Sequence, residues 1–407
     1  MRILVLNQYF HPDRSATSQL LTELCEDLAE RHDVFVVTGR PSYNAAHDTS
    51  SRGLVSRERH GRVRVARVWS TTFDRAAGMP GRLTNYGTYL TSSVAGAFSV
   101  ARPDVVVALT DPPPVGLIGA AIAKARRVPF VLVVKDLFPE VAVHLGALRN
   151  TAAIDALRAA RSTLLSAADR VVSIGRDMDA RLLELGVERD RIATIHDWSD
   201  GRVVRPLDRV SALRARKGWG DRFVVMHSGN VGLSQDLSTA IAAADLLRTD
   251  PEVMFAIVGE GASKGPLQAD ATLRGLENVA FLPFQDRHEL SESLGAADVH
   301  LVGLQRGLAG AIVPSKVYGI LAAGKPYLAA VEAGAEPALI VDEHACGMRV
   351  EPGDPRALAD GVLAMRDADL VAMGKRGREA FETRFDRWYA ADRYERVLLE
   401  TVAEARR

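Results

Sequence analysis

The feature that most constrains the fold is a regular alternation of short apolar runs with amphipathic helical segments. Residues 18–31 illustrate the helical segments, because Leu20, Leu21, Leu24 and Leu28 recur there at helical spacing. The apolar runs do not alternate with polar residues, which is typical of strands buried on both faces of a parallel sheet. The pattern therefore predicts an α/β fold in which helices cover parallel sheets.

The pattern runs once through the first half of the chain and starts again in the second. In the first half we expect strands within residues 2–10, 33–39, 63–68, 104–110, 129–136 and 170–175. In the second half we expect them within residues 222–232, 253–261, 279–284, 299–304 and 326–331.

Because 407 residues exceed one ordinary core, we predict two Rossmann-like doubly wound domains, 1–196 and 206–385. The linker between them is expected at 196–206, where no clear period is visible. The strongly helical segment 386–407 is predicted to pack back across both domains.

Composition and missing motifs exclude several classes of function. The formal net charge is zero, so no general attraction to nucleic acid is indicated. Cys25 and Cys346 are far apart and are expected to be reduced core residues. The sequence has no dinucleotide fingerprint, Walker loop, zinc-ligand spacing or evident acidic cluster for Mg²⁺. We therefore expect no cofactor and no metal.

The amino-terminal segment also bears on the compartment. It lacks the basic start, the long apolar centre and the cleavage site of a signal peptide. No stretch reaches about 18 uninterrupted apolar residues, the length that suggests a membrane span. We expect a cytoplasmic protein, with peripheral contact to the membrane face as an additional expectation.

The stretch "VPSKVYGILAAGKP" (residues 313–326) is the first candidate binding site. Ligands of parallel α/β sheets bind beyond the carboxyl ends of the strands, and this stretch follows an apolar run. Pro314 suits a first helical turn, so Ser315 and Lys316 would lie at the positive end of a helix. The residues alone leave two interpretations open: an anion site, or an ordinary core helix with a solvated lysine.

Two further junctions in the second half share this character. Gly229 and Asn230 follow one expected strand, while Gly261 and Lys264 follow another. Glycine allows a close approach of the backbone to a ligand, although tight turns are the alternative explanation. Together, the three junctions predict a site for a polyanion such as a nucleoside diphosphate.

The first half contributes acidic candidates. Asp136 and Glu140 lie at the exit of the strand expected within residues 129–136, and carboxylates there could orient sugar hydroxyls or act as a base. The alternative is a helix-capping aspartate and a solvated glutamate.

Taken in order, these motifs resemble those of retaining glycosyltransferases of family 4. The motifs are "YFHPD", "TGRPSYN", "VVKDLFPE", "IHDWSD", "HSGNVGLSQDL", "FAIVGEG", "VAFLPF" and "VPSKVYGILAAGKP". The resemblance spans almost the whole chain and is closest to the branch that builds bacterial surface polysaccharides from N-acetylamino-sugar or fucose-type donors. It implies the GT-B fold, with two Rossmann-like domains facing across a cleft. The donor would bind mainly the second domain and the acceptor mainly the first.

The resemblance also implies roles for single residues. The residues implied to bind the donor are Gly229, Asn230, Gly261, Phe284, Gln285, Ser315 and Lys316. Those implied to act in catalysis are Asp136, Lys264 and Lys316, and those on the acceptor side are Ser15 and Glu140. Two departures from the family pattern are evident: Ala311 and Gly319 stand where two glutamates are usual, and Arg14, Ser15 and Ala16 replace a glycine pair.

The predicted reaction is transfer of a sugar from a nucleoside-diphosphate sugar to a hydroxyl, with retention of configuration and without a metal. We expect a polyprenyl-phosphate-linked or other glycan as the acceptor, because residues 73–104 mix aromatic residues with Arg75 and Arg82 as in a membrane-interface segment. A core helix is the alternative for that segment. A nucleotide-sugar 2-epimerase, an enzyme making small-molecule glycosides and a non-catalytic nucleotide-binding protein remain competing functions. The sequence leaves the base, the sugar, the acceptor and the oligomeric state open.

Overall fold

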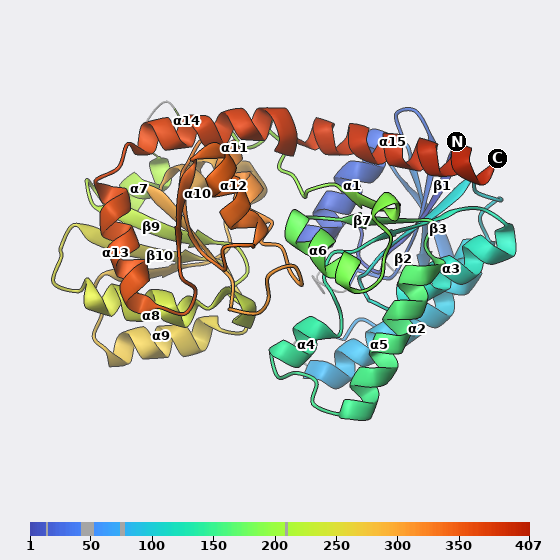
Figure 1. Ribbon diagram of the computed structural model, residues 1–407, viewed down its shortest axis with the longest axis horizontal. Coiled ribbons are helices and arrows are strands. Elements are labelled where there is room, and N and C mark those ends of the chain that lie inside the picture. The colour runs from blue at the N-terminus through green and yellow to red at the C-terminus, as the bar shows by residue number, and fades with distance from the viewer. Residues whose placement is uncertain (14, 42–52, 74–77, 208–210) are drawn as a thin grey trace.

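The computed structural model describes residues 1–13, 15–41, 53–73, 78–207 and 211–407 (Figure 1). Two lobes, each built around its own sheet, stand side by side, and the carboxyl-terminal helices run along one side of both (Figure 1). The first lobe holds an eight-stranded sheet and the second a six-stranded sheet.

The sheet of the first domain has the order β3-β4-β2-β1-β5-β6-β7-β8. Its strands are β1 (Arg2–Leu6), β2 (Asp33–Thr38), β3 (Val55–His60), β4 (Val63–Val68), β5 (Val105–Leu109), β6 (Phe130–Val133), β7 (Arg170–Ser173) and β8 (Ile192–Thr194). The helices are α1 (Ala16–Leu28), α2 (Gly78–Phe98), α3 (Val115–Arg126), α4 (Glu140–His144), α5 (Thr151–Ala167) and α6 (Arg176–Glu184). Neighbouring strands are parallel except for β3, which pairs antiparallel with β4.

The sheet of the second domain is parallel throughout and has the order β11-β10-β9-β12-β13-β14. Its strands are β9 (Phe223–Ser228), β10 (Val253–Val258), β11 (Val279–Leu282), β12 (Val299–Gly303), β13 (Tyr327–Ala330) and β14 (Gly347–Val350). The helices are α7 (Ala212–Arg216), α8 (Leu237–Leu246), α9 (Lys264–Leu273), α10 (Leu290–Gly295), α11 (Lys316–Ala322), α12 (Glu336–His344), α13 (Pro355–Arg366) and α14 (Leu370–Ala380).

The continuous apolar runs are explained by burial on both sheet faces. In β1, Leu4 and Leu6 belong to one hydrophobic cluster, whereas Ile3 and Val5 belong to another. Successive side chains of a strand point to opposite faces, so both faces of β1 are covered. Predicting parallel strands from unbroken apolar runs was therefore correct for this strand.

Three strands escaped prediction. β3 has the sequence VSRERH and forms a partly exposed antiparallel edge, where charged side chains can face solvent. β8 and β14 are also edge strands, of three and four residues, and too short to give an apolar run. All three lie at sheet edges, where burial on one side is not required.

The carboxyl-terminal segment connects the two domains. α14 continues through a π-helical turn (Phe381–Phe385) to α15 (Arg387–Ala405). Tyr394 and Leu398 of α15 belong to the same cluster as Ile3 and Val5 of β1, so this helix closes the core of the first domain. Figure 1 shows the segment crossing from the second lobe to the first.

The loop between β12 and α11 lies between the two domains and contacts the chain that leaves β6. The Leu137 N–H donates to Ala311 O over 2.9 Å, and Asp136 forms an antiparallel bridge with Ile312. The Gly310 N–H donates to the Asp177 carboxylate over 3.1 Å. The exit of β6 in the first domain therefore lies directly against the loop that leads to Lys316.

Candidate functional site

Lys316 is the central residue of the candidate site. It is the first residue of α11, and its Nζ lies 3.1 Å and 3.2 Å from the two ring nitrogens of His227 at the end of β9. Burial lowers the pKa of this half-buried amine to about 7. Within the part of the chain that the structure describes, Lys316 forms no ion pair with a carboxylate, and its amine contacts His227. A positive charge on this amine therefore has no counter-charge among the described residues.

The loop after β9 leaves space next to this amine. Gly229 has φ +128°, a conformation that favours glycine, and a Cβ added there would lie 3.8 Å from Lys316 Cε. Asn230, the next residue, is exposed. Because β9 and β12 are neighbours in the parallel sheet, their exits meet at one edge. The structure thus brings Gly229, Asn230 and Lys316 together, as a common site requires.

Ser315 precedes Lys316 at the start of α11. It stands at the N-cap position with φ −65° and ψ −15°, and its side chain caps no backbone N–H. The hydroxyl is thus not committed to holding the helix. The predicted contact of Ser315 with a diphosphate stays a prediction.

Gly259 and Gly261 serve the packing of two loops against each other. A Cβ on Gly259 would come 1.8 Å from Gly229 O, and one on Gly261 would come 2.2 Å from Val231 O. The Val231 N–H donates to Glu260 O over 2.9 Å, which joins the loops through their backbones. Gly261 therefore shapes the loop that carries Gly229, whatever else it contacts.

Lys264 has a very different environment from Lys316. Its Nζ donates to Gly259 O over 2.9 Å, to Leu282 O over 3.0 Å and to Glu260 Oε1 over 2.7 Å. An ammonium group has three N–H donors, so all of them are used. These contacts favour a role in tying the exits of β10 and β11 together. A catalytic contact of Lys264 with the diphosphate would require exchange of one of these bonds.

Phe284 and Gln285 follow β11. The Phe284 side chain is 57% exposed, and its ring lies 3.4 Å from the position of a Cβ on Gly259. Gln285 Nε2 donates to Pro283 O over 2.9 Å. An exposed aromatic ring at a strand exit offers an apolar face to a planar ligand group such as a nucleobase.

Asp136 lies beyond the end of β6 in the first domain, where its backbone is bridged to Ile312 of the second domain. It keeps an exposed surface, yet residues of both domains crowd around it at this bridge. This crowding raises the pKa of its carboxyl to about 6; the charge of Lys135 opposes the shift and that of Asp197 adds to it. A carboxylate in this position can accept a hydrogen bond from a sugar hydroxyl.

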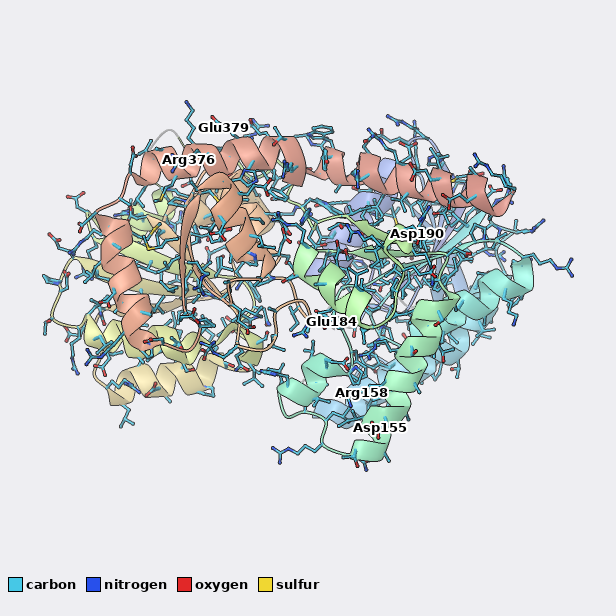
Figure 2. The ribbon with its side chains drawn as sticks, in the orientation of Figure 1. Asp155, Arg158, Glu184, Asp190, Arg376 and Glu379 are labelled. Carbon is cyan, nitrogen blue, oxygen red and sulfur yellow. The ribbon has the colours of Figure 1, made fainter. Side chains whose placement is uncertain are left out.

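The two predicted acceptor-side residues both have partners that hold the fold. Ser15 Oγ accepts from the Ser18 N–H over 3.1 Å and so caps α1. Glu140 pairs with Arg161 and, over 3.3 Å, with Arg158, which is labelled on α5 in Figure 2. Burial alone would raise the pKa of Glu140, but these arginines lower it below its ordinary value. Their predicted contacts with an acceptor stay predictions, and Arg14 lies outside the described residues.

Two groups of functional interest were not predicted. His227 belongs to a run that reads as an apolar strand, and only the histidine at its end could have signalled the contact with Lys316. Glu336 at the start of α12 is fully buried between the domains, where it binds Arg176 over 2.9 Å and His196 over 3.0 Å. Nothing around Glu336 in the sequence indicates these distant partners.

The described residues include no group of three or more His, Cys, Asp or Glu side chains placed to hold a metal ion. In the same ranges of the chain, no helix is long and apolar enough to cross a membrane. The expectation of a metal-independent reaction stays a prediction.

Comparisons with known proteins give matches along the chain. Residues 16–198 match a family model described as a glycosyl transferase 4-like domain, and residues 211–379 match glycosyl transferases group 1. The chain is 32% identical to the probable glycosyltransferase WbjE of Pseudomonas aeruginosa, over 75% of this chain and 76% of that protein. It is 30% identical to the putative colanic acid biosynthesis glycosyl transferase WcaI of Escherichia coli K12, over 89% and 91% of the two chains.

Solved structures are similar in fold at much lower sequence identity. Anabaena HepE in complex with UDP superposes with a TM-score of 0.75 at 17% identity, covering 98% of this chain and 100% of HepE. WaaG, a glycosyltransferase involved in lipopolysaccharide biosynthesis, has a TM-score of 0.68 at 15% identity, covering 98% and 99% of the two chains.

Proposed function

This chain belongs to glycosyltransferase family 4 and has the predicted GT-B fold, and we propose that it transfers a sugar from a nucleoside-diphosphate sugar to a hydroxyl acceptor with retention of configuration. Family membership favours this reaction over an epimerase or a non-catalytic nucleotide-binding protein. The names of WcaI and WaaG, which refer to colanic acid and lipopolysaccharide, support an acceptor in the assembly of a surface polysaccharide or glycolipid.

The observation that carries the proposal is the environment of Lys316. A half-buried cation that lacks a carboxylate partner is costly unless an anion compensates it. The neighbouring Gly229 loop provides backbone close to the amine. A diphosphate between Lys316, Ser315 and the Gly229–Asn230 turn would supply the missing negative charge. The similar structure of HepE with UDP supports this class of ligand.

The same arrangement suggests how transfer would be accelerated. Negative charge builds up on the diphosphate as its bond to the sugar breaks. A pre-positioned cation stabilises that charge, and removing one such group typically costs about 10²–10³-fold in rate. Asp136 across the interdomain space would orient a hydroxyl of the sugar or of the acceptor, and Phe284 would contact the base.

Exposed apolar side chains of the first domain support a lipid-linked acceptor. Leu54, Trp69, Phe73 and Leu83 are between 40% and 60% exposed. Phe73 is fixed against α2, since its N–H and C=O bond the Asn85 side chain over 3.0 Å and 2.9 Å. Tyr89, in contrast, is fully buried and donates to Val37 O, so the core-helix interpretation holds for that part of α2. Arg75 and the side chain of Arg82 lie outside the described residues.

The decisive experiment uses labelled nucleotide sugars. A thermal-shift panel first identifies the donor, since a ligand that binds only the folded state raises its stability. The selected donor is then incubated with polyprenyl-phosphate-linked acceptors. Wild-type protein should form a glycosylated product with the anomeric configuration of the donor, and Lys375→Met, an exposed lysine of α14, should match it. Epimerised donor, or binding without transfer to any acceptor, would contradict the proposal.

Contact with the membrane is tested separately. Flotation with anionic liposomes should recover the wild-type protein with the vesicles, and replacement of Phe73 and Leu83 by serine should reduce the recovered fraction. If neither protein floats, the membrane part of the proposal is wrong, while the transfer reaction is unaffected.

A further inference from the structure

The contact between His227 and Lys316 is unusual because both groups are bases. His227 is 2% exposed, at the end of β9, and both of its ring nitrogens lie within 3.2 Å of Lys316 Nζ. An ammonium group can donate to a neutral ring nitrogen, but two positive charges at this distance would repel each other. The pair therefore holds at most one positive charge.

The side chains that act electrostatically on the pair are basic. His300, on the neighbouring strand β12, is fully buried and helps to lower the pKa of His227. Lys325 and Lys316 in turn help to lower the pKa of His300. The remaining partners of His227 are backbone groups of Asn230 and Leu301. Burial, then Lys316, lowers the pKa of His227, and burial lowers that of Lys316. No carboxylate is among the groups that shift either pKa.

We propose that the His227–Lys316 pair takes up a proton when the diphosphate of a nucleotide sugar binds, with His227 acting as the positioning residue that holds the amine. This inference rests on the proposed function, because it assigns the diphosphate to Lys316. A neutral imidazole accepts a hydrogen bond from the amine without lending it negative charge. Because burial disfavours the charged amine, it loses its proton readily in the empty site and regains it beside the anion.

The sign of the pH dependence follows from linkage. Because the pKa of Lys316 in the empty protein is about 7, the amine is protonated below that pH and increasingly neutral above it. The anion binds the protonated form, so affinity should be constant at low pH. Above pH 7 it should fall by up to about tenfold per pH unit. An ordinary solvated lysine would give a flat profile throughout this range.

The first test needs no ligand. In protein labelled with ¹³C at the ε-carbon of lysine, one signal should titrate with a midpoint near 7, and Lys316→Arg should remove it. A Lys316 signal that titrates near its ordinary pKa would overturn the proton uptake and leave the proposed function standing.

The second test measures binding of UDP-glucose and GDP-mannose from pH 6 to pH 9 by calorimetry in buffers of different ionisation enthalpy. At pH 8, wild-type protein should take up close to one proton. Lys316→Arg, which stays charged, should bind without uptake and with a flat profile. A flat wild-type profile would overturn the proposal, and binding of neither nucleotide sugar would contradict the proposed function and with it this inference.

The role of His227 is tested by two variants that differ in hydrogen bonding. Gln at position 227 can accept a bond from the amine, whereas Phe can fill the buried space but cannot accept. We expect His227→Gln to keep donor affinity within about threefold and His227→Phe to weaken it about tenfold. If His227 only fills the core, the order reverses, since the buried Phe would be tolerated better than Gln. That reversed order would overturn the positioning role.

Discussion

Three strand-to-helix junctions of the second domain each carry a charged side chain, but only one leaves that charge without a counter-charge. Lys264 at the β10–α9 junction has three acceptors, and Glu336 at the β13–α12 junction is bound by Arg176 and His196. Lys316 at the β12–α11 junction has a histidine ring beside it and no carboxylate partner among the described residues. The difference separates charges that hold the fold from one that is free to bind.

The comparison has an energetic basis. A buried charge whose hydrogen bonds are satisfied helps to hold the folded structure, because removing it leaves its buried partners unpaired. A charge without such partners can be removed with little effect on the fold. Substitutions at the three junctions should therefore separate activity from stability.

The largest effect is expected for Lys316→Met. Removing the cation should lower the transfer rate by about 10²–10³-fold, because the departing diphosphate loses its main stabilising charge. The melting temperature should stay the same or rise slightly, since a half-buried cation without an anionic partner disappears. Initial rates and thermal unfolding of the same preparations check both statements, with Lys375→Met as the control. Full activity of Lys316→Met would show that the charge at this junction, like those at the other two, does not act on the diphosphate.

Glu336→Gln should instead affect stability. Replacing the buried carboxylate removes the anion that Arg176 and His196 share and leaves Arg176 with only the partly exposed Glu343, and we expect a loss of about 3 kcal/mol in the free energy of unfolding at pH 7. Despite its burial, His196 and Arg176 lower the pKa of Glu336 to about 2. The contribution of this carboxylate is thus complete above the unfolded-state pKa of about 4.3 and disappears as pH falls toward 2.

Urea unfolding at pH 7, 4 and 3 measures this window. The difference between wild type and Glu336→Gln should shrink with falling pH. Glu343→Gln on the same helix is the matched control, because Glu343 pairs with the same Arg176 over 3.0 Å but is partly exposed. It should change stability by less than about 1 kcal/mol. If Glu336→Gln lowers the free energy of unfolding by the same amount at every pH, the charge of Glu336 is not the source of its contribution.

These contrasts show what a sequence can and cannot reveal about such a site. Parallel strands place their exits at one edge of the sheet, so the positions of Gly229, Asn230 and Lys316 near one another followed from the strand pattern alone. The direction of the Lys264 amine did not, because it is set by acceptors at the exits of two different strands, β10 and β11, which a sequence does not place in space. His227 and Glu336 were missed because each gains its meaning from a residue at least 89 positions away.

Lys264→Met tests whether the second junction is structural. Losing the bonds to Gly259 O and Leu282 O should lower the free energy of unfolding by about 1–3 kcal/mol. Donor affinity should weaken about tenfold, with turnover of bound donor within about threefold of wild type. The control is Glu260→Gln, which removes the ion pair and leaves both carbonyl contacts in place. If Lys264→Met lowers turnover as much as Lys316→Met does, Lys264 contacts the diphosphate as the sequence predicted.

The smallest effect is expected for Ser315→Ala. The hydroxyl caps no backbone group, so its removal should leave the melting temperature unchanged. If it donates to the diphosphate, loss of one hydrogen bond worth about 1 kcal/mol should weaken donor affinity about fivefold. Ser211→Ala is the opposite control: Ser211 is buried, caps α7 by accepting from the Leu213 N–H over 3.1 Å, and should affect stability without affecting affinity. Calorimetric titration of the donor and thermal unfolding distinguish the two serines, and a lower melting temperature for Ser315→Ala would assign its hydroxyl to the fold instead of the ligand.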